Sequence, residues 1–501
     1  MLVTPRLEKV TFQKCNQVTN KNKVECKLGV YEDELQVLCS NANACLLSAE
    51  ITGGEIRYNG KAVFTVVCSD GKELKKYESG VEFSFKFNSG IAGSVEALNL
   101  ASVTLDGVEV IKQNGVLQVS ATVLFKGEVC YLEECEQVSF ATTEVLTKKQ
   151  TSEKCERLTK VEKTFTVQDD FDIDKKVKDV IFTTQKVYIT NTQCGIGSVI
   201  IDGEVEYSLA FQTAASANEV SAQNRRVPFR YELESGEVMP NNIAISCAAI
   251  SNYNAKVYVD ENKNKSSVTV DIELLLSAVV YENVTYTYCV DAYSLTNNLK
   301  LENSLKTLET ITATLYSEQK IVSDLAYFDE NAGLICLLND KIEELEATFK
   351  NGVISVKGAL MLTMLLDNGG ELKAQTALVP FETQFKVDAE LVKNVTLAIS
   401  SVEVIKDGGK FTCSFTLKVN YACASQKTAN VLCNIEEGDK KPLNDSAISV
   451  YIASIGEDLW DVCKALNTSE EVITALNQNL TFPLESEERI IIYRELSKDA
   501  E

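Results

Sequence analysis

Cysteine is the residue type in this 501-residue chain with the most evident chemistry, because thiolates bind metals and form disulfides. There are sixteen cysteines and no histidine, so a zinc site of the zinc-ribbon type would have to be an all-cysteine site. Cys130 and Cys135 are five residues apart, and Cys413, Cys423 and Cys433 are ten apart, so these cysteines lack the Cys-x-x-Cys spacing of zinc ribbons. We expect buried, reduced thiols and no metal. Crosslinking of some of them under oxidising conditions stays open.

No catalytic constellation is evident. Without imidazole, the most common general acid–base group near neutral pH is missing. The acidic run Asp169, Asp170, Asp172 and Asp174 lacks the glycine and terminal glutamate of a calcium-binding EF-hand loop, so we expect a solvated acidic turn there. Phosphate-binding glycine motifs are also missing. The sequence predicts a protein that is not an enzyme and needs no cofactor.

The charge balance and hydropathy exclude further classes. The chain has 49 Lys and Arg against 72 Asp and Glu, a net charge of −23, which repels phosphate backbones and makes nucleic acid a poor partner. No stretch approaches 18 consecutive apolar residues, so we expect no membrane span. The segment Met1–Glu8 has no apolar secretory core, and we therefore expect a cytoplasmic protein.

A glycine-centred pattern recurs three times along the chain, around Gly60, Gly203 and Gly358. Apolar residues occupy every second position on both sides of each glycine: Ile56, Tyr58, Ala62, Phe64 and Val66; Val199, Ile201, Val205, Tyr207 and Leu209; Ile354, Val356, Leu360, Leu362 and Met364. This alternation predicts three equivalent strands, each with one face buried against a core.

Two further marks follow each glycine strand. The first is Val81-Glu82-Phe83, Val227-Pro228-Phe229 and Val379-Pro380-Phe381. Since proline lacks a backbone donor, we expect these segments to open a strand or lie at a sheet edge. The second is a five-residue identity between 108–112 and 402–406, with a weaker counterpart at 256–259.

The repeats predict a mainly β protein with three tandem β-sandwich-like domains, at residues 1–147, 148–300 and 301–441. The Lys-, Glu- and Thr-rich stretch 147–160 is typical of a connector. The sequence after the acidic, turn-like segment 436–442 changes to helical spacing. A strand at 448–452, helices at 459–466 and 468–477 and a strand at 489–493 predict a small βααβ module at residues 446–497.

The module resembles a LysM domain in Tyr451, the run Gly456-Glu457-Asp458-Leu459-Trp460, Thr468-Ser469, Val472, Leu476-Asn477 and the strand Ile490–Ile492. LysM domains usually bind N-acetylglucosamine glycans in a groove between the loop after the first strand and the loop after the second helix. By this resemblance the groove residues are Gly456, Glu457, Asp458, Leu459, Asn477, Gln478, Asn479, Leu480 and Phe482. The core residues are Tyr451, Trp460, Val472, Leu476 and Ile491. Trp460 is expected to pack inward; the alternative is a platform for sugar stacking.

The glycine strands and Val-Pro-Phe marks resemble the SPOCS domain of spore-coat proteins in clostridial Firmicutes. Repeated SPOCS domains before a terminal LysM module resemble the SipL family of spore-coat morphogenetic proteins. The resemblance implies a non-enzymatic scaffold in the mother-cell cytoplasm. There its LysM groove would hold stage IV sporulation protein A, the ATPase of the coat basement layer, at the forespore surface.

For a protein partner we expect an apolar centre of Leu459, Leu480 and Phe482 inside an acidic rim that includes Glu457, Asp458 and Glu485. The alternative is a cell-wall or spore-cortex protein that binds peptidoglycan through this LysM module. The sequence leaves open which of the two binds, the oligomeric state and the role of each repeat.

Overall fold

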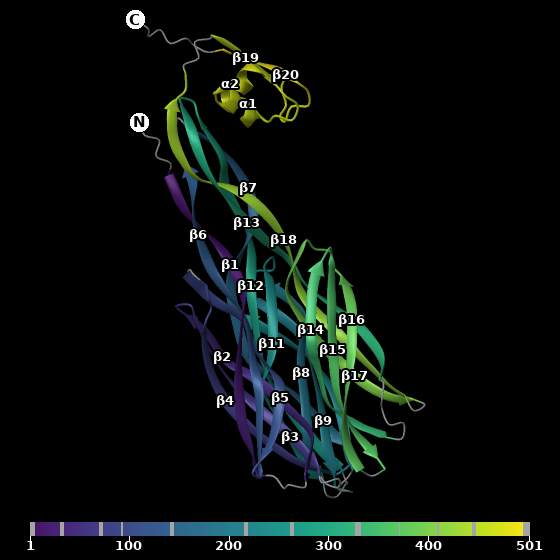
Figure 1. The fold of residues 1–501 in the computed structure, drawn as a ribbon. Coiled ribbons are helices and arrows are strands. Elements are labelled where there is room, and N and C mark those ends of the chain that lie inside the picture. Colours follow the sequence, from purple (N-terminus) through teal and green to yellow (C-terminus); the bar gives the residue numbers. More distant parts are fainter. Residues whose placement is uncertain are drawn as a thin grey trace.

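A computed structural model of the chain describes residues 6–30, 35–69, 74–91, 94–140, 145–214, 219–260, 265–325, 332–369, 371–407, 410–442 and 447–493. The fold is mainly β, as predicted, with two short helices near the C-terminus (Figure 1). The outer limits predicted for the first domain and for the C-terminal module, at residues 1, 446 and 497, lie outside the described residues.

The first eighteen strands form six antiparallel sheets of three strands each. The first six strands are β1 (Arg6–Val30), β2 (Gln36–Thr52), β3 (Glu55–Ser69), β4 (Leu74–Asn88), β5 (Ser94–Gln113) and β6 (Val116–Phe140). They make one sheet in the order β1-β6-β5 and another in the order β2-β3-β4. The first and last strands of this set therefore pair with each other, which closes it as a structural unit.

The same topology recurs twice. The second unit contains β7 (Val145–Ile173), β8 (Val177–Gly195), β9 (Ser198–Thr213), β10 (Val220–Glu234), β11 (Ile243–Asp260) and β12 (Lys265–Ser294). The third contains β13 (Asn297–Leu325), β14 (Gly333–Lys350), β15 (Val353–Asn368), β16 (Glu371–Lys386), β17 (Leu391–Asp407) and β18 (Lys410–Lys440). Their sheets run β7-β12-β11 with β8-β9-β10, and β13-β18-β17 with β14-β15-β16.

Each unit has a core shared by its two sheets. The alternating apolar residues predicted around Gly60, Gly203 and Gly358 lie on β3, β9 and β15, and all fifteen are at most 1% exposed. This confirms the prediction of one buried face, because a strand in the middle of a sheet places every second side chain on the core side. Pro228 and Pro380 lie on the edge strands β10 and β16, as predicted.

The recurring glycine has a steric role. Gly60, Gly203 and Gly358 lie directly opposite Phe83, Phe229 and Phe381 of the neighbouring strand. A Cβ atom at any of the three glycines would press against the facing phenyl ring. The missing side chain on the central strand therefore makes room for an aromatic ring from the edge strand.

The first and last strands of each unit are long and continue beyond the cores. Residues 6–16, 130–140, 145–157, 281–294, 297–311 and 424–440 form three paired ribbons that twist together as a narrow stalk (Figure 1). Small apolar clusters join the ribbons, for example Phe12 with Tyr286, Tyr288, Leu308 and Val431. The stretch 147–160, predicted to be a connector, is part of β7 in this stalk, and the segment 436–440 is the end of β18.

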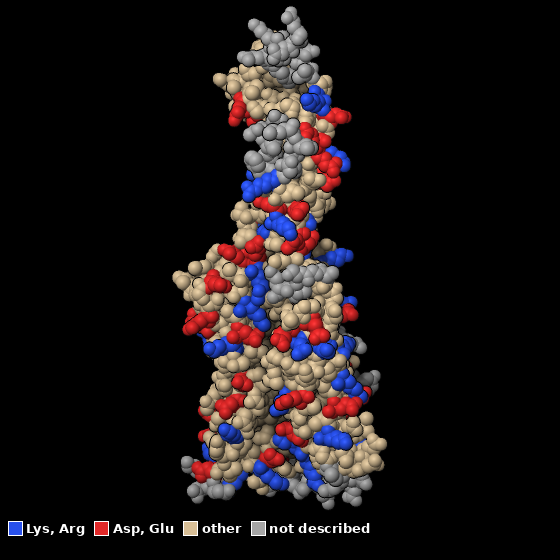
Figure 2. Space-filling view, turned by 90° about the vertical axis from the view of Figure 1, so that its left-hand side faces the viewer, with Lys and Arg blue, Asp and Glu red and all other residues tan. Residues whose placement is uncertain are grey.

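At the opposite end, the three units meet around one apolar cluster. It includes Cys39 and Val67 of the first unit, Phe182 of the second, and Cys336 and Leu365 of the third. The units thus lie side by side, and the molecule is broad at this base and narrow along the stalk (Figure 2). The visible face in Figure 2 carries basic and acidic side chains interspersed.

The C-terminal module lies at the far end of the stalk (Figure 1). It consists of β19 (Ile448–Ala453), α1 (Leu459–Leu466), α2 (Glu470–Leu476) and β20 (Glu488–Tyr493), with β19 and β20 antiparallel. The predicted βααβ order is confirmed. In the part of the chain that the structure describes, no helix has the length and apolar character needed to cross a bilayer.

Candidate functional site in the C-terminal module

Local capping signals explain why α1 begins and ends where it does. Asp458 accepts from the backbone N–H of Asp461 at 2.9 Å, and the Asp461 carboxylate accepts from the backbone of Asp458, forming a capping box. Asn467 ends the helix in the left-handed conformation, with φ of 54°. Asp458 is therefore a helix-capping residue, and this role fixes the direction of the loop that precedes α1.

The two loops predicted to form a groove do lie together. The backbone N–H of Gly456 donates to the Leu484 carbonyl at 2.8 Å, and the Leu484 N–H donates to the Glu457 carbonyl at 3.0 Å. Gly456 has φ of +87°, a conformation that favours glycine. The loop after β19 and the loop after α2 are thus joined by backbone hydrogen bonds at this point.

The predicted groove residues have different environments. Asn477 ends α2 and exchanges hydrogen bonds of 3.3 Å with the backbone N–H and carbonyl of Ile491, so it holds the helix to the edge of β20. Gln478 and Asn479 are exposed. The apolar residues Leu459, Leu480 and Phe482 are half-buried and pack against the core of the module. These three side chains therefore contribute to the core of the module as well as to its surface.

Glu457 has one carboxylate oxygen in a buried position. Its Oε1 atom accepts from the Tyr451 hydroxyl at 3.2 Å, whereas its Oε2 atom is buried without a hydrogen-bond partner among the described residues. Burial raises the pKa of Tyr451, and the neighbouring Glu457 raises it further. The carboxylate is therefore directed into the module and is not part of an open acidic rim.

The module's core differs in part from the prediction. Tyr451 is half-buried and Trp460 is 7% exposed, but Val472, Leu476 and Ile491 are 37%, 41% and 38% exposed. The buried residues are instead Ile473, next to Val472, and Ile490 and Ile492, which flank Ile491. They belong to a cluster with Ala453, Val462, Cys463, Leu466 and Leu484. In β20 the inward positions are 490 and 492, so residue 491 faces the other way.

Helix α1 attaches the module to the stalk. The indole Nε1 of Trp460 donates to Asp291 of β12 at 2.8 Å, and Lys464 forms an ion pair with the same carboxylate at 2.8 Å. The Trp460 ring meets Tyr293 edge to face, with centroids 4.8 Å apart. Trp460 is buried between the module and the stalk, which leaves its ring unavailable as a sugar platform.

Polar contacts extend this junction. Lys148 of β7 binds Asp458 at 2.5 Å, the Tyr293 hydroxyl donates to the Thr468 carbonyl at 2.7 Å, and Lys441 donates to the Asn467 side chain at 2.7 Å. Asp458, predicted to rim an open groove, is instead shared between helix capping and the stalk. The pKa of Asp458 is lowered, because its hydrogen bonds with Lys148 and Asp461 outweigh the opposing effect of burial.

The sheet of the module has an exposed apolar side that the sequence reasoning missed. Ile448, Val450 and Ile452 of β19 are 57%, 58% and 59% exposed, and Ile491 and Tyr493 of β20 are 38% and 60% exposed. Because Ile448 is paired with Tyr493 and Val450 with Ile491, these side chains share one face. We call these five residues the outer sheet face. The signal was a strand with apolar residues at consecutive positions, 450–453, which implies apolar side chains on both faces.

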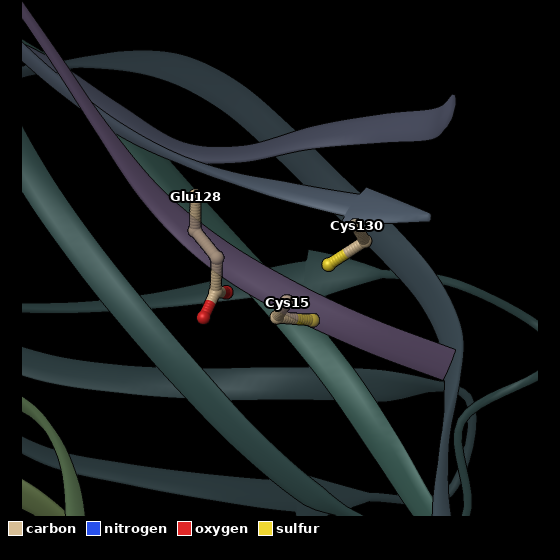
Figure 3. A group of neighbouring side chains, drawn as sticks. All are labelled: Cys15, Glu128 and Cys130. Atoms are coloured by element: carbon tan, nitrogen blue, oxygen red, sulfur yellow. The ribbon is translucent and has the colours of Figure 1, made fainter. Parts of the chain in front are cut away.

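The cysteines singled out in the sequence do not gather at one site. Cys413 and Cys423 belong to the core of the third unit, whereas Cys433 lies in the stalk beside Cys135. A different group comes together instead: Cys15 of β1 with Glu128 and Cys130 of β6 (Figure 3). Cys15 and Cys130 are 115 positions apart, so only the pairing of β1 with β6 reveals this group.

No known protein-family model, no curated protein and no solved structure matches this chain.

Proposed function

We propose that this chain is a non-enzymatic scaffold of endospore-coat assembly in Firmicutes, built from three SPOCS-like β-sandwich repeats and a LysM-like module. In this proposal it acts in the mother-cell cytoplasm at the forespore surface. The module binds a protein partner, stage IV sporulation protein A, and links it to the β units. The observation that carries the proposal is the outer sheet face, which presents five large apolar side chains at the end of a stalk.

The position of this face supports a role in protein contact. Monomeric proteins rarely expose contiguous apolar patches, and such patches commonly mark interaction sites. The module contacts the stalk through α1, whereas the outer sheet face is formed by β19 and β20. The contact with the stalk therefore leaves the outer sheet face exposed. A rigidly held face also lowers the entropy cost of binding a partner.

Charge supports a particular kind of partner surface. The described residues 447–493 carry eight acidic and two basic side chains. An apolar centre within an acidic surrounding fits a partner patch with apolar residues and a basic margin. We therefore expect binding that weakens as salt is raised but persists at high salt, because the apolar contact is not screened.

The second candidate is peptidoglycan binding by the same LysM-like module. It is favoured by the exposed amides of Gln478 and Asn479, which follow α2 beside the joined loops. Amide groups can hydrogen-bond sugar hydroxyls and acetamido groups. The buried Trp460 and the stalk-bound Asp458 are then unavailable, which leaves few polar groups for a glycan.

A binding assay with the full chain separates these functions. Purified stage IV sporulation protein A and purified peptidoglycan are each tested against the wild-type chain and against Val450→Glu, which places a charge in the outer sheet face. The scaffold proposal predicts capture of the protein and at least tenfold weaker capture by the variant, because the charge would be desolvated in the contact. The matched control is Ile196→Glu, in the turn between β8 and β9, where the native side chain is 84% exposed.

Two results would contradict the scaffold proposal. One is no binding of the protein by the wild-type chain; the other is equal binding by Val450→Glu and the wild type. Retention on peptidoglycan that is lost in Asn479→Ala would establish the glycan-binding alternative. Circular dichroism of each variant verifies that the β fold is retained.

A further inference from the structure

Two thiols and a carboxyl group converge where the stalk meets the first unit. Cys15 and Cys130 are direct partners across β1 and β6. Glu128 precedes Cys130 by two positions on the same strand, so both side chains lie on the same side of the sheet. Their ligand atoms, two Sγ and one carboxylate oxygen, all lie within 4.8 Å of one another (Figure 3).

The surroundings of this group differ from those of an ordinary packed thiol. Asn99, which is 0% exposed, donates from Nδ2 to Cys130 Sγ at 3.0 Å, and its Oδ1 atom has no hydrogen-bond partner among the described residues. The Tyr281 hydroxyl donates to Glu128 at 3.4 Å. A donor to the sulfur and a donor to the carboxylate are the outer contacts that orient metal ligands in proteins.

Cys15 and Glu128 also border a cavity. A cavity of about 60 Å³ is lined by Cys15 and Glu128 and, across it, by Cys155, Glu309 and Lys393. Cys130 and Glu128 are buried and Cys15 is half-buried, so Cys15 lies on the side from which an ion could enter. The cavity has room for an ion and an additional ligand such as water.

An uncompensated acidic group is costly in this position. Glu128 is 7% exposed and Cys130 is 0% exposed, so a negative charge on either residue would be poorly solvated. Lys393 lines the same cavity, but it already forms an ion pair with Glu309. A carboxyl group and two thiols are thus held together with little positive charge to balance them.

We propose that Cys15, Cys130 and Glu128 bind one thiophilic divalent cation, with Zn²⁺ as the best fit. Zn²⁺ takes tetrahedral sulfur and carboxylate ligands at about 2.3 Å and 2.0–2.2 Å, so its ligand atoms lie roughly 3.5–3.8 Å apart. The ligand atoms of this group lie within 4.8 Å of one another, so small side-chain movements would bring them to these distances. The fourth position faces the cavity and is taken by water. On binding, each thiol releases its proton to solvent.

Charge supports this assignment. Two thiolates and one carboxylate carry a charge of −3, and a bound Zn²⁺ reduces the net charge of the group to −1. The ion would join β1 to β6 at the base of the stalk. Through Glu128 and Tyr281 it would also tie the first unit to β12 of the second unit. The inference does not depend on the proposed function, since it concerns the β units alone.

The test uses the full chain, reduced and freed of metal, and titrated with Zn²⁺ and with Co²⁺ as a spectroscopic probe. We expect one ion per chain and a near-ultraviolet thiolate-to-cobalt band. Cys15→Ser and Cys130→Ser should weaken Zn²⁺ binding at least 100-fold and remove or diminish the band, and Glu128→Gln should weaken binding about tenfold. Cys194→Ser, a half-buried cysteine of β8 in the second unit, is the matched control and should bind as the wild type does.

A second measurement needs no variant. Zn²⁺ should slow alkylation of Cys15 in the native chain and leave Cys26, another half-buried cysteine of β1, unaffected. The proposal is overturned if the reduced chain gives no thiolate-to-cobalt band. It is also overturned if Cys15→Ser keeps the full band, or if Zn²⁺ leaves the alkylation rate of Cys15 unchanged.

Discussion

The indole N–H of Trp460 and the carboxylate of Asp291 are 2.8 Å apart, although the two residues are 169 positions apart in the chain. This hydrogen bond joins helix α1 of the module to β12 of the stalk, beside the edge-to-face contact of Trp460 with Tyr293. Because Trp460 is the only tryptophan, its fluorescence reports on this junction alone. The junction therefore offers a direct test of whether the module is held rigidly.

Asp291→Ala should release the module from the stalk. The change leaves the buried indole N–H without its acceptor, which costs about 1–3 kcal/mol, and it also removes the partner of Lys464. We expect quenching of Trp460 fluorescence by acrylamide to increase. Asp291→Asn keeps an acceptor oxygen and should have a smaller effect. Glu50→Ala, at an exposed acidic residue of β2, is the control and should leave quenching unchanged; equal quenching in all four proteins would argue against the junction.

Acid should loosen the same junction. Burial alone would raise the pKa of Asp458, but the hydrogen bonds from Lys148 and the Asp461 backbone outweigh it and hold the pKa below its ordinary value. A lowered pKa means that the contact contributes fully near neutral pH and is lost as the pH falls through and below about 4. Trp460 quenching should therefore stay constant from about pH 8 to 5 and increase at lower pH.

Lys148→Met provides the comparison for this pH dependence. It removes the main group that lowers the pKa of Asp458, so the docked state is weaker at neutral pH and the acid transition should begin at higher pH. An acid transition identical to that of the wild type would show that the Lys148–Asp458 pair does not hold the module.

The features of the fold that depend on a single strand could be predicted from the sequence. The residues flanking Gly203 alternate because a sheet with one buried face imposes a period of two, and Pro228 marks an edge because it lacks a donor. The stalk was not predictable in this way. Most residues of the stretch 147–160 are only half-buried, so it has the polar composition of a connector although it is part of a strand.

The candidate sites depend on contacts that no local pattern encodes. Trp460 was expected to pack inward, yet its partner Asp291 comes from another unit of the chain. Cys15 meets Cys130 only because the first and last strands of a unit pair. Whether Ile491 or its two neighbours face the core depends on the register of β20. Because residues 490–492 are all isoleucine, the sequence does not specify this register.

Two cysteines of the stalk should crosslink under oxidation. Cys135 of β6 and Cys433 of β18 pack in the same part of the stalk, and Cys433 has a pKa raised by burial and by Cys135. Treatment with glutathione disulfide should join them: the two thiols lose two protons and two electrons, and the reagent is reduced to two glutathiones. Peptide mapping by mass spectrometry should find a Cys135–Cys433 peptide that is absent from Cys433→Ser. Recovery of Cys433 only as the free thiol or the glutathione adduct would contradict this prediction.

Alanine at the recurring glycine should destabilise the units in a graded order. At Gly203, a Cβ would meet the Phe229 ring and lie 2.7 Å from the Tyr188 carbonyl oxygen, which is backbone and cannot rotate away. We expect Gly203→Ala to cost about 1–3 kcal/mol, in the range of overpacked cores. At Gly358 the nearest atoms belong to the side chains of Phe381 and Leu345, the closest at 2.9 Å, so Gly358→Ala should cost less.

Gly236→Ala is the matched control for this series, because the added Cβ would meet open space and the backbone does not need a positive φ. Thermal unfolding followed by circular dichroism should rank the midpoints as wild type and Gly236→Ala, then Gly358→Ala, then Gly203→Ala. The order of midpoints is the quantity to compare, since a chain of several units need not unfold in a single step. A Gly203→Ala midpoint equal to that of Gly236→Ala would mean that Phe229 can move aside. The glycine would then not be required by the facing ring, and its recurrence in all three units would need another cause.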